Sequence, residues 1–250
     1  MESSATALAT PDTSPSQPPL LSLTGVTKRF GGATALNNVD FELAAGETHG
    51  LIGENGAGKS TLMKILSGVH QPDEGEIRIR GEVVHFANPA EARARGIGMV
   101  YQELSLMPAL TVAENVFLGR QLVNRMGMID WPRMNREAAS QLSALGIDID
   151  VTERLGNLSL GAQQLVEIAR TAYSGADIIV LDEPTSALSA RESQRLFDLM
   201  GTLKSQGKSL IFISHFLEDV LAVCDRVTVL KNSRKVTTLP VEGLTKNRMI

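Results

Sequence analysis

The chain has 250 residues, of which 43% are hydrophobic and 21% charged, so it is long enough for one large domain with a sizeable core. Its net charge of −4 argues against a nucleic-acid-binding surface. The single cysteine, Cys224, excludes an internal disulfide and a zinc ribbon, and its apolar neighbours predict a buried thiol.

The beginning of the chain, residues 1–19, is rich in Ser, Thr, Ala and Pro and contains neither Lys nor Arg. It lacks the charged start and the apolar centre of a secretion signal. It also cannot bury enough apolar surface to order itself. We therefore expect a disordered tail here and a folded domain over residues 20–250, in which no apolar run approaches the roughly 20 residues needed to span a bilayer.

Strand patterns begin at 21–23 and return at 39–43, where Val39, Phe41 and Leu43 alternate with polar residues. Between them, Phe30 is expected to be an exposed aromatic in a loop. Its ring could stack on a nucleotide base or could pack at the edge of the core, and the residues alone leave both roles open.

A phosphate-binding loop follows at residues 53–61, where Gly, four residues and Gly-Lys-Ser match the P-loop pattern. An apolar strand is expected before it at 48–52 and a helix after it, ending near Gly68, which is the structural context that the pattern requires. The residues concerned are Gly53, Glu54, Asn55, Gly56, Ala57, Gly58, Lys59, Ser60 and Thr61.

The chemistry of this loop follows from its residue types. Gly53, Gly56 and Gly58 lack a Cβ, so the backbone N–H groups can approach anionic oxygens closely. Lys59 can reach the β- and γ-phosphates, and the hydroxyl of Ser60 can bind Mg²⁺. The sequence therefore predicts that the chain binds a nucleoside triphosphate.

Downstream, a hairpin around Gly81-Glu82 is expected, followed by a short helix that starts at Pro89 and by a strand over 97–101 that ends at Gln102. The pattern then turns helical over 103–173. Helices are predicted from the capping box at 111–114, over 132–145 and after residue 161, with Trp131 packing as a staple against the second of them.

Two acidic residues stand at the end of the next strand, 178–181, which is apolar throughout and therefore predicted to be buried on both faces. Asp182 can hold Mg²⁺, through water, and Glu183 can orient or deprotonate an attacking water molecule. A second capping box, at Ser189, predicts a helix ending at Gly207. His215 follows the strand at 209–213 and suits a contact with the γ-phosphate, although His at a strand end has many uses.

Taken in chain order, these motifs resemble those of the ATP-binding cassette (ABC) family over nearly all of residues 21–250. The similar segments are the Walker A loop at 53–61, the Q-loop glutamine Gln102, the ABC signature at 158–164, the Walker B run at 179–184, the D-loop at 186–189 and the switch histidine His215.

This resemblance implies an α/β fold: a P-loop NTPase (RecA-like) core with an antiparallel β subdomain and an inserted α-helical subdomain. The core would comprise 20–102 and 174–250, and the helical subdomain 103–173. The cofactors implied are ATP and Mg²⁺, with Phe30 stacking on adenine and Gln102 reaching the metal and the reacting phosphate. Ser159 and Gly161 of the signature would bind the ATP held by a second cassette.

Two departures from the common family pattern, at Leu160 and Ala162 of the signature and at Ser189 of the D-loop, are similar to the carbohydrate-importer branch (ribose, xylose and galactoside type). Members of that branch carry two cassettes, and this chain resembles the first. The resemblance implies an ATPase at the cytoplasmic face of the inner membrane. Its partners would be permease subunits, a second cassette and, indirectly, a periplasmic or extracellular sugar-binding protein, with no nucleic acid.

Two alternatives were weighed against a sugar importer. A soluble ABC ATPase of DNA repair would need long coiled coils inside the core, and one of translation is usually basic; neither feature occurs in the sequence. A regulatory nucleotide-binding module without turnover is disfavoured because Glu183 and His215 are both present.

Overall fold

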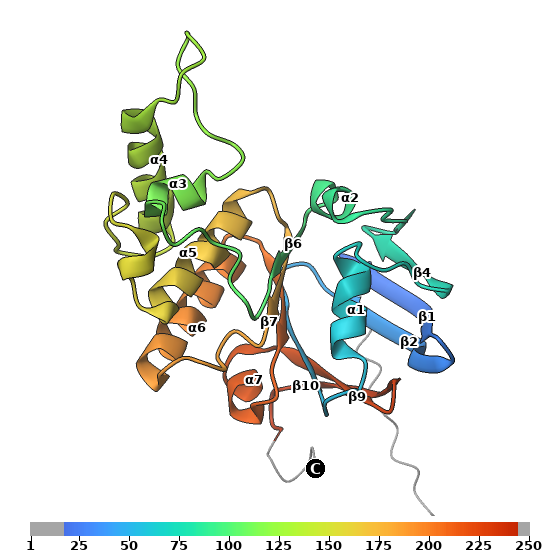
Figure 1. Ribbon diagram of the computed structural model, residues 1–250. Helices are drawn as coiled ribbons and strands as arrows, with labels where there is room; N and C mark the ends of the chain where they lie inside the picture. Colours follow the sequence, from blue (N-terminus) through green and yellow to red (C-terminus); the bar gives the residue numbers. More distant parts are fainter. Residues whose placement is uncertain (1–17, 245–250) are drawn as a thin grey trace, which may run out of the picture.

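The computed structural model describes residues 18–244 (Figure 1). The tail expected over 1–19 therefore lies almost entirely outside the described residues. Within 18–244 the chain forms two β-sheets, with helices on both sides of the larger one (Figure 1).

The smaller sheet is antiparallel, in the order β2-β1-β4-β5. Its strands are β1 (Leu21–Phe30), β2 (Ala33–Leu43), β4 (Glu74–Ile79) and β5 (Glu82–Val84). The alternation predicted at Val39, Phe41 and Leu43 is confirmed, since all three side chains are buried. The turn of the predicted hairpin lies one residue earlier than expected, at Arg80-Gly81, where both residues have positive φ.

The larger sheet has six strands in the order β10-β9-β3-β8-β7-β6 and is parallel except for β10 at its edge. Its strands are β3 (Thr48–Gly53), β6 (Ile97–Val100), β7 (Ile178–Asp182), β8 (Ser209–Ile213), β9 (Arg226–Lys231) and β10 (Arg234–Pro240).

Alternate residues of its buried strands enter two different cores, because successive side chains point to opposite faces of a sheet. On β7, Ile178 and Val180 join a core shared with α1 (Lys59–Leu66) and the antiparallel sheet. Ile179 and Leu181 join a core shared with α5 (Leu160–Tyr173), α6 (Ala190–Ser205) and α7 (Leu217–Val223). The apolar run of β7 is thus buried on both faces, as predicted.

The remaining helices are α2 (Pro89–Ala94), α3 (Val112–Val116), α4 (Trp131–Ala144) and the 3₁₀ turn η1 (Leu155–Asn157). From α3 to α5 the chain is helical, and this part projects from one end of the molecule (Figure 1). The capping box predicted at Thr111 and Glu114 is present, with both hydrogen bonds formed.

Two local expectations were wrong, and one helix was not predicted. Trp131 does not pack as a staple: it is the first residue of α4, capped by Asp130, and its side chain is 47% exposed. Phe30 is exposed as predicted, but it is the last residue of β1 rather than part of a loop. Helix α7 was not predicted: unlike the shorter α2 and α3, it begins without an N-terminal Pro or a capping box, and its N-cap, Phe216, makes no side-chain hydrogen bond.

The two sheets are joined by the turn between β9 and β10. The backbone carbonyl of Ser233 accepts a hydrogen bond from the N–H of Asn37 at 2.8 Å, and its hydroxyl donates to the carbonyl of Thr34 at 2.9 Å. Both bonds end on β2. The turn therefore ties the edge of the parallel sheet to the antiparallel sheet.

The α/β fold class is confirmed by this architecture and by the related structures described below, whereas the domain limits stay predictions. Cys224 is buried, as expected. Within residues 18–244, no helix combines the length and the apolar character that a bilayer-spanning segment needs.

Candidate nucleotide site

The phosphate loop joins β3 to α1 at the end of a central strand of the parallel sheet. Gly56 and Gly58 have φ of 81° and 107°, values that other residues rarely adopt. A Cβ on Gly58 would lie 2.7 Å from the carbonyl oxygen of Ala35 in β2. The loop thus passes so close to the antiparallel sheet that only glycine fits there.

Lys59, the first residue of α1, is 7% exposed and folds back over the loop. Its Nζ donates hydrogen bonds to the carbonyl oxygens of Gly53 at 2.5 Å and Glu54 at 3.2 Å. The helix N-cap is Gly58, which has no side chain to cap the first N–H groups. These N–H groups and the positive end of the helix dipole therefore point toward the cavity as donors for an anion.

The end of β7 faces this loop across a cavity of about 280 Å³. Its lining residues come from β2, from the phosphate loop and α1, and from the end of β7: Ala35, Asn55, Gly56, Gly58, Lys59, Ser60, Thr61, Asp182 and Glu183. The structure therefore brings the predicted phosphate loop and the predicted carboxylate pair together, although more than 120 residues separate them in the sequence.

Burial in this cavity raises the pKa of the Asp182 carboxyl above its ordinary value. The neighbouring charge of Glu183 raises that pKa further, and the Lys59 ammonium opposes both effects. Asp182 thus sits where its negative charge is poorly stabilised. A bound cation would remove that penalty.

The donor set in the cavity fits both a triphosphate and Mg²⁺. Ser60 and Asp182 supply hard oxygen ligands, while Lys59 and the loop N–H groups suit phosphate oxygens. Among the described residues, no group of three His, Cys, Asp or Glu could hold a metal ion alone. Proteins usually bind Mg²⁺ through one or two side chains together with substrate phosphates, and Ser60 and Asp182 could be two such side chains.

Glu183 follows β7 in an unusual backbone conformation, with φ of 47°. Its N–H donates to the carbonyl of Ile213 at 3.0 Å, which fixes it against the end of β8. His215, two residues further along that strand end, places Nδ1 3.4 Å from Oε1 of Glu183. His215 thus lies beside Glu183, which lines the cavity, although His215 itself is not among the lining residues.

Other predicted residues lie outside the cavity. Gln102 follows β6, next to β7 in the sheet, but its side chain is exposed and does not line the cavity. Phe30 is 42% exposed and meets the ring of His70 edge-on, with ring centroids 5.1 Å apart. The ammonium of Lys28 lies over the ring, 5.5 Å from its centroid, and stacking of Phe30 on a base stays a prediction.

Ser159 and Gly161 stand at the start of α5, on the helical part of the chain. Ser159 caps that helix by accepting a hydrogen bond from the N–H of Ala162. Its own hydroxyl donates to Oε1 of Glu192 in α6 at 3.0 Å. Sequence reasoning identified Glu192 as part of a capping box and missed this second contact, which depends on how α5 and α6 pack.

Ala35 was also missed. It lines the cavity because β2 lies against the phosphate loop at Gly58, and no local pattern in the sequence predicts that approach.

Comparison with known proteins accounts for this arrangement. Residues 36–186, more than half of the chain, match the family described as ABC transporter. The chain belongs to the ABC transporter family. The match runs from β2 through the phosphate loop and the signature to the D-loop, so the family expected from the motifs is confirmed.

The chain resembles ABC proteins of sugar import in particular. It is 48% identical over 233 residues to the ribose import ATP-binding protein RbsA 2 of Rubrobacter xylanophilus, covering 93% of this chain and 45% of that protein. It is 44% identical over 242 residues to a putative ribose/galactose/methyl galactoside import ATP-binding protein of Burkholderia lata, covering 96% and 47%. The chain thus spans about half the length of these relatives.

Solved ABC cassettes share the fold. The ADP conformation of MJ1267, an ATP-binding cassette of an ABC transporter, has a TM-score of 0.80 at 26% identity, covering 90% of this chain and 93% of that one. A dimeric post-hydrolysis state of the cassette MJ0796, bound to ADP and Pi, has a TM-score of 0.74 at 28% identity, covering 90% and 100%.

Proposed function

We propose that this chain is an ATP-binding and ATP-hydrolysing cassette that powers sugar import through a membrane permease. The observation that carries the proposal is the cavity in which Lys59, Ser60, Asp182 and Glu183 meet. The similarity to sugar-import ATP-binding proteins supports the transported class.

In this proposal the groups of the cavity that can bind phosphate or metal have separate roles. Lys59 exchanges the carbonyls of Gly53 and Glu54 for the β- and γ-phosphate oxygens of ATP. Ser60 and Asp182 hold Mg²⁺, which neutralises the charge that develops on the phosphates. The loop N–H groups and the start of α1 hold the remaining phosphate oxygens.

Hydrolysis then depends on Glu183, which orients a water molecule and accepts a proton from it as the water oxygen bonds to the γ-phosphorus and the bond to the β-phosphate oxygen breaks. His215 contacts the γ-phosphate from the neighbouring strand end. Gln102 reaches the metal and the attacking water only if its exposed segment moves toward the cavity.

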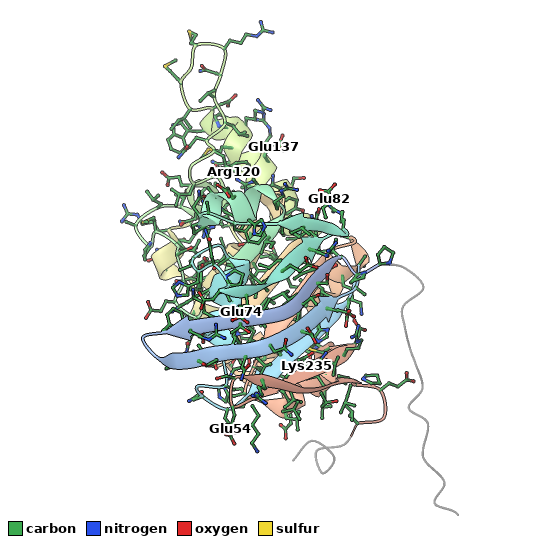
Figure 2. All side chains as sticks on the ribbon, turned by 90° about the vertical axis from the view of Figure 1, so that its right-hand side faces the viewer. Glu54, Glu74, Glu82, Arg120, Glu137 and Lys235 are labelled. Carbon is green, nitrogen blue, oxygen red and sulfur yellow. The ribbon has the colours of Figure 1, made fainter. Side chains whose placement is uncertain are left out.

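A second cassette completes the site. Figure 2 shows Glu54 of the phosphate loop and Glu137 of α4 at opposite ends of the molecule, so the outer helical part of this chain is far from its own phosphate loop. We propose that Ser159 and Gly161 instead bind the γ-phosphate held by a second cassette. ATP then favours the closed pair because it binds that state more tightly than the open one.

Coupling to a permease would use a groove beside the helical part. This groove, of about 410 Å³, is lined by residues of α2 and β6, by Tyr101 and Ser105, by the chain after α3, and by Arg170 and Thr171 of α5. It lies next to Gln102 in the sequence. We propose that it receives a short helix of the permease.

A buried hydrogen-bond cluster connects this groove to α5. The carboxylate of Glu167, 1% exposed, accepts from the N–H and the hydroxyl of Ser105 and from Arg170, the shortest of these bonds being 2.6 Å. Because the segment after Gln102 is fixed to the helix that begins at Ser159, a displacement at the groove reaches the signature.

The cassette would accordingly lie at the cytoplasmic face of the cell membrane, bound to permease subunits and paired with a second cassette. A sugar-binding protein on the outer side would deliver the sugar, and the chain would resemble the first cassette of a two-cassette protein.

Vanadate trapping tests the proposal. Purified chain is incubated with radiolabelled ATP, Mg²⁺ and orthovanadate, with and without permease reconstituted in vesicles, and free nucleotide is then removed. We expect retained ADP that requires Mg²⁺ and increases with the permease and the transported sugar. Binding of ATP without phosphate release or trapping under any of these conditions would leave only a nucleotide-binding module.

A further inference from the structure

The start of α5 is already occupied by a carboxylate of the same chain. Glu192, in the first turn of α6, places Oε1 3.0 Å from the hydroxyl oxygen of Ser159. The backbone N–H of Gly161 lies close enough to this carboxylate to help lower its pKa. A Cβ added to Gly161 would lie only 2.6 Å from the same Oε1, so the carboxylate packs directly against the helix start.

The two oxygens of Glu192 have different partners. Oε2 accepts from the N–H of Ser189 at 3.1 Å and from its hydroxyl at 2.7 Å, which forms the capping box of α6. Oε1 instead accepts a hydrogen bond from the hydroxyl of Ser159, which is not part of the α6 cap. One side chain therefore caps its own helix and reaches the beginning of another.

The Glu192 carboxylate carries a full negative charge at neutral pH. The hydroxyl and N–H of Ser189, followed by the hydroxyl of Ser159, hold the pKa of this carboxyl below its ordinary value. The Glu192 carboxylate is thus an anion at the start of α5, where the helix dipole, the Ser159 hydroxyl and the Gly161 N–H all favour negative charge. The γ-phosphate of ATP is an anion of the same kind.

We propose that Glu192 is an autoinhibitory contact: in a single cassette it occupies Ser159 and Gly161, the donors that the γ-phosphate of a second cassette's ATP must take. This inference rests on the proposed pairing of cassettes. Closure would require the Glu192 carboxylate to move away from Ser159 and Gly161. The carboxylate and the γ-phosphate are both anions and would repel each other strongly at the same two donors. ATP at low concentration would then fail to close the pair.

The contact also connects the signature to the cavity. Residues 184–188 run directly from Glu183 to the α6 cap, and Ser186 returns an N–H to the carbonyl of Glu183 at 3.3 Å. The hydroxyl of Ser186 donates to the same carbonyl at 3.0 Å, and Ser189 stays bonded to Oε2 of Glu192, so this segment is a continuous hydrogen-bonded link between Glu183 and the start of α6.

The test measures ATP-dependent dimer formation by light scattering in a Glu183→Gln background, in which turnover is suppressed. Glu192→Gln removes the charge but retains an oxygen for the cap, since Gln also forms capping boxes. We expect half-maximal dimer formation at a concentration of ATP about fivefold lower, the effect of removing one like charge a few ångströms away in water.

A matched control is Glu114→Gln, which makes the same change in the capping box at Thr111, away from the signature. It should leave the ATP requirement unchanged. Glu192→Ala empties the donors as well as losing the cap, and its thermal unfolding identifies any loss of folding. It should also lower the ATP requirement in the folded fraction.

The outcomes separate the two proposals. An unchanged or higher ATP requirement in Glu192→Gln, with dimerisation intact in the background variant, overturns the autoinhibitory contact and indicates that Glu192 positions the signature instead. If neither protein dimerises at saturating ATP, the proposed pairing itself fails, and this inference fails with it.

Discussion

Nδ1 of His215 lies 3.4 Å from Oε1 of Glu183, although 31 residues lie between them in the chain. The pairing of β7 with β8 causes this proximity, because Asp182 and Ile213 are register partners at the same end of the sheet. A histidine at this position can contact both the Glu183 carboxylate and a group bound next to that carboxylate.

His215→Ala should lower ATP turnover by roughly 10- to 100-fold, the factor that corresponds to losing one hydrogen bond to a charged group in the transition state, while the Kd for ATP changes little. His215 is not among the residues that line the cavity, so the phosphate-binding groups of the loop and Lys59 remain in this variant. Steady-state hydrolysis and nucleotide titration measure the two quantities. His85→Ala, a change at an exposed histidine, serves as the control.

Glu183→Gln should retain ATP binding and lose turnover by at least about 100-fold, as expected for loss of a general base. Gln keeps the size of the side chain and cannot accept the proton. Phosphate release should fall while ATP-dependent pairing is prolonged. Equal turnover in Glu183→Gln and parent would contradict the role given to Glu183, and Glu137→Gln on α4 provides the matched control.

Lys59→Ala should weaken ATP binding by about 100-fold, since hydrogen bonds to charged groups contribute roughly 1.5–3 kcal/mol each. The carbonyls of Gly53 and Glu54 would also lose their donor. Isothermal titration measures the affinity. Lys64→Ala removes an exposed lysine from the same helix and should bind ATP normally; similar weakening in both variants would argue against a specific role for Lys59.

Asp182→Asn should make the nucleotide-free protein more stable at neutral pH, by about 0.5–1 kcal/mol. The folded-state pKa of Asp182 is raised, chiefly by burial, so its charged form destabilises the fold. Below the unfolded-state pKa this penalty is absent, and it appears as the pH rises through the folded-state pKa. Urea unfolding at neutral and acidic pH should show a gain only at neutral pH.

Glu47→Gln should lower the free energy of unfolding by about 1–3 kcal/mol at neutral pH, as expected for a disturbed buried hydrogen-bond network. Burial alone would raise the pKa of Glu47, but the hydrogen bond and charge of His49, the N–H of Ala44 and the charge of Arg226 together lower it. Its contribution is therefore present above the unfolded-state pKa and is lost as the pH falls through the folded-state pKa.

Glu47→Gln and the parent protein are compared by the urea concentration at the midpoint of unfolding, measured at a series of pH values from neutral to acidic. The difference from the parent protein should shrink toward the acidic end. Glu42→Gln, at an exposed position on β2, should show no difference at either end. A constant difference across the range would contradict an electrostatic origin.

The parts of this structure that follow from local chemistry were predictable. The spacing of its Gly, Lys and Ser residues predicts the phosphate loop. A four-residue pattern predicts the capping boxes at Thr111 and Ser189. The buried run of β7 is visible because both of its faces must be apolar. These features require no knowledge of the rest of the chain.

Features that arise from packing between distant elements could not be predicted. The approach of Ala35 to Gly58 depends on how β2 meets the loop, and the contact of Glu192 with Ser159 depends on how α5 lies against α6. Trp131 was expected to pack as a staple against the following helix, whereas it is the first residue of α4 and is 47% exposed. Residue type alone does not report such geometry.

The turn at Ser233 has a consequence for how this protein could be tuned. Through its bonds to Thr34 and Asn37 it fixes the inclination of β2, and through β2 that of β1, whose last residue is Phe30. Because Ala35 of β2 also lies against Gly58 of the phosphate loop, a substitution in this surface turn that tilts β2 should move the loop as well as the end of β1. The shape of the nucleotide cavity is thereby adjustable from a turn whose residues do not line it.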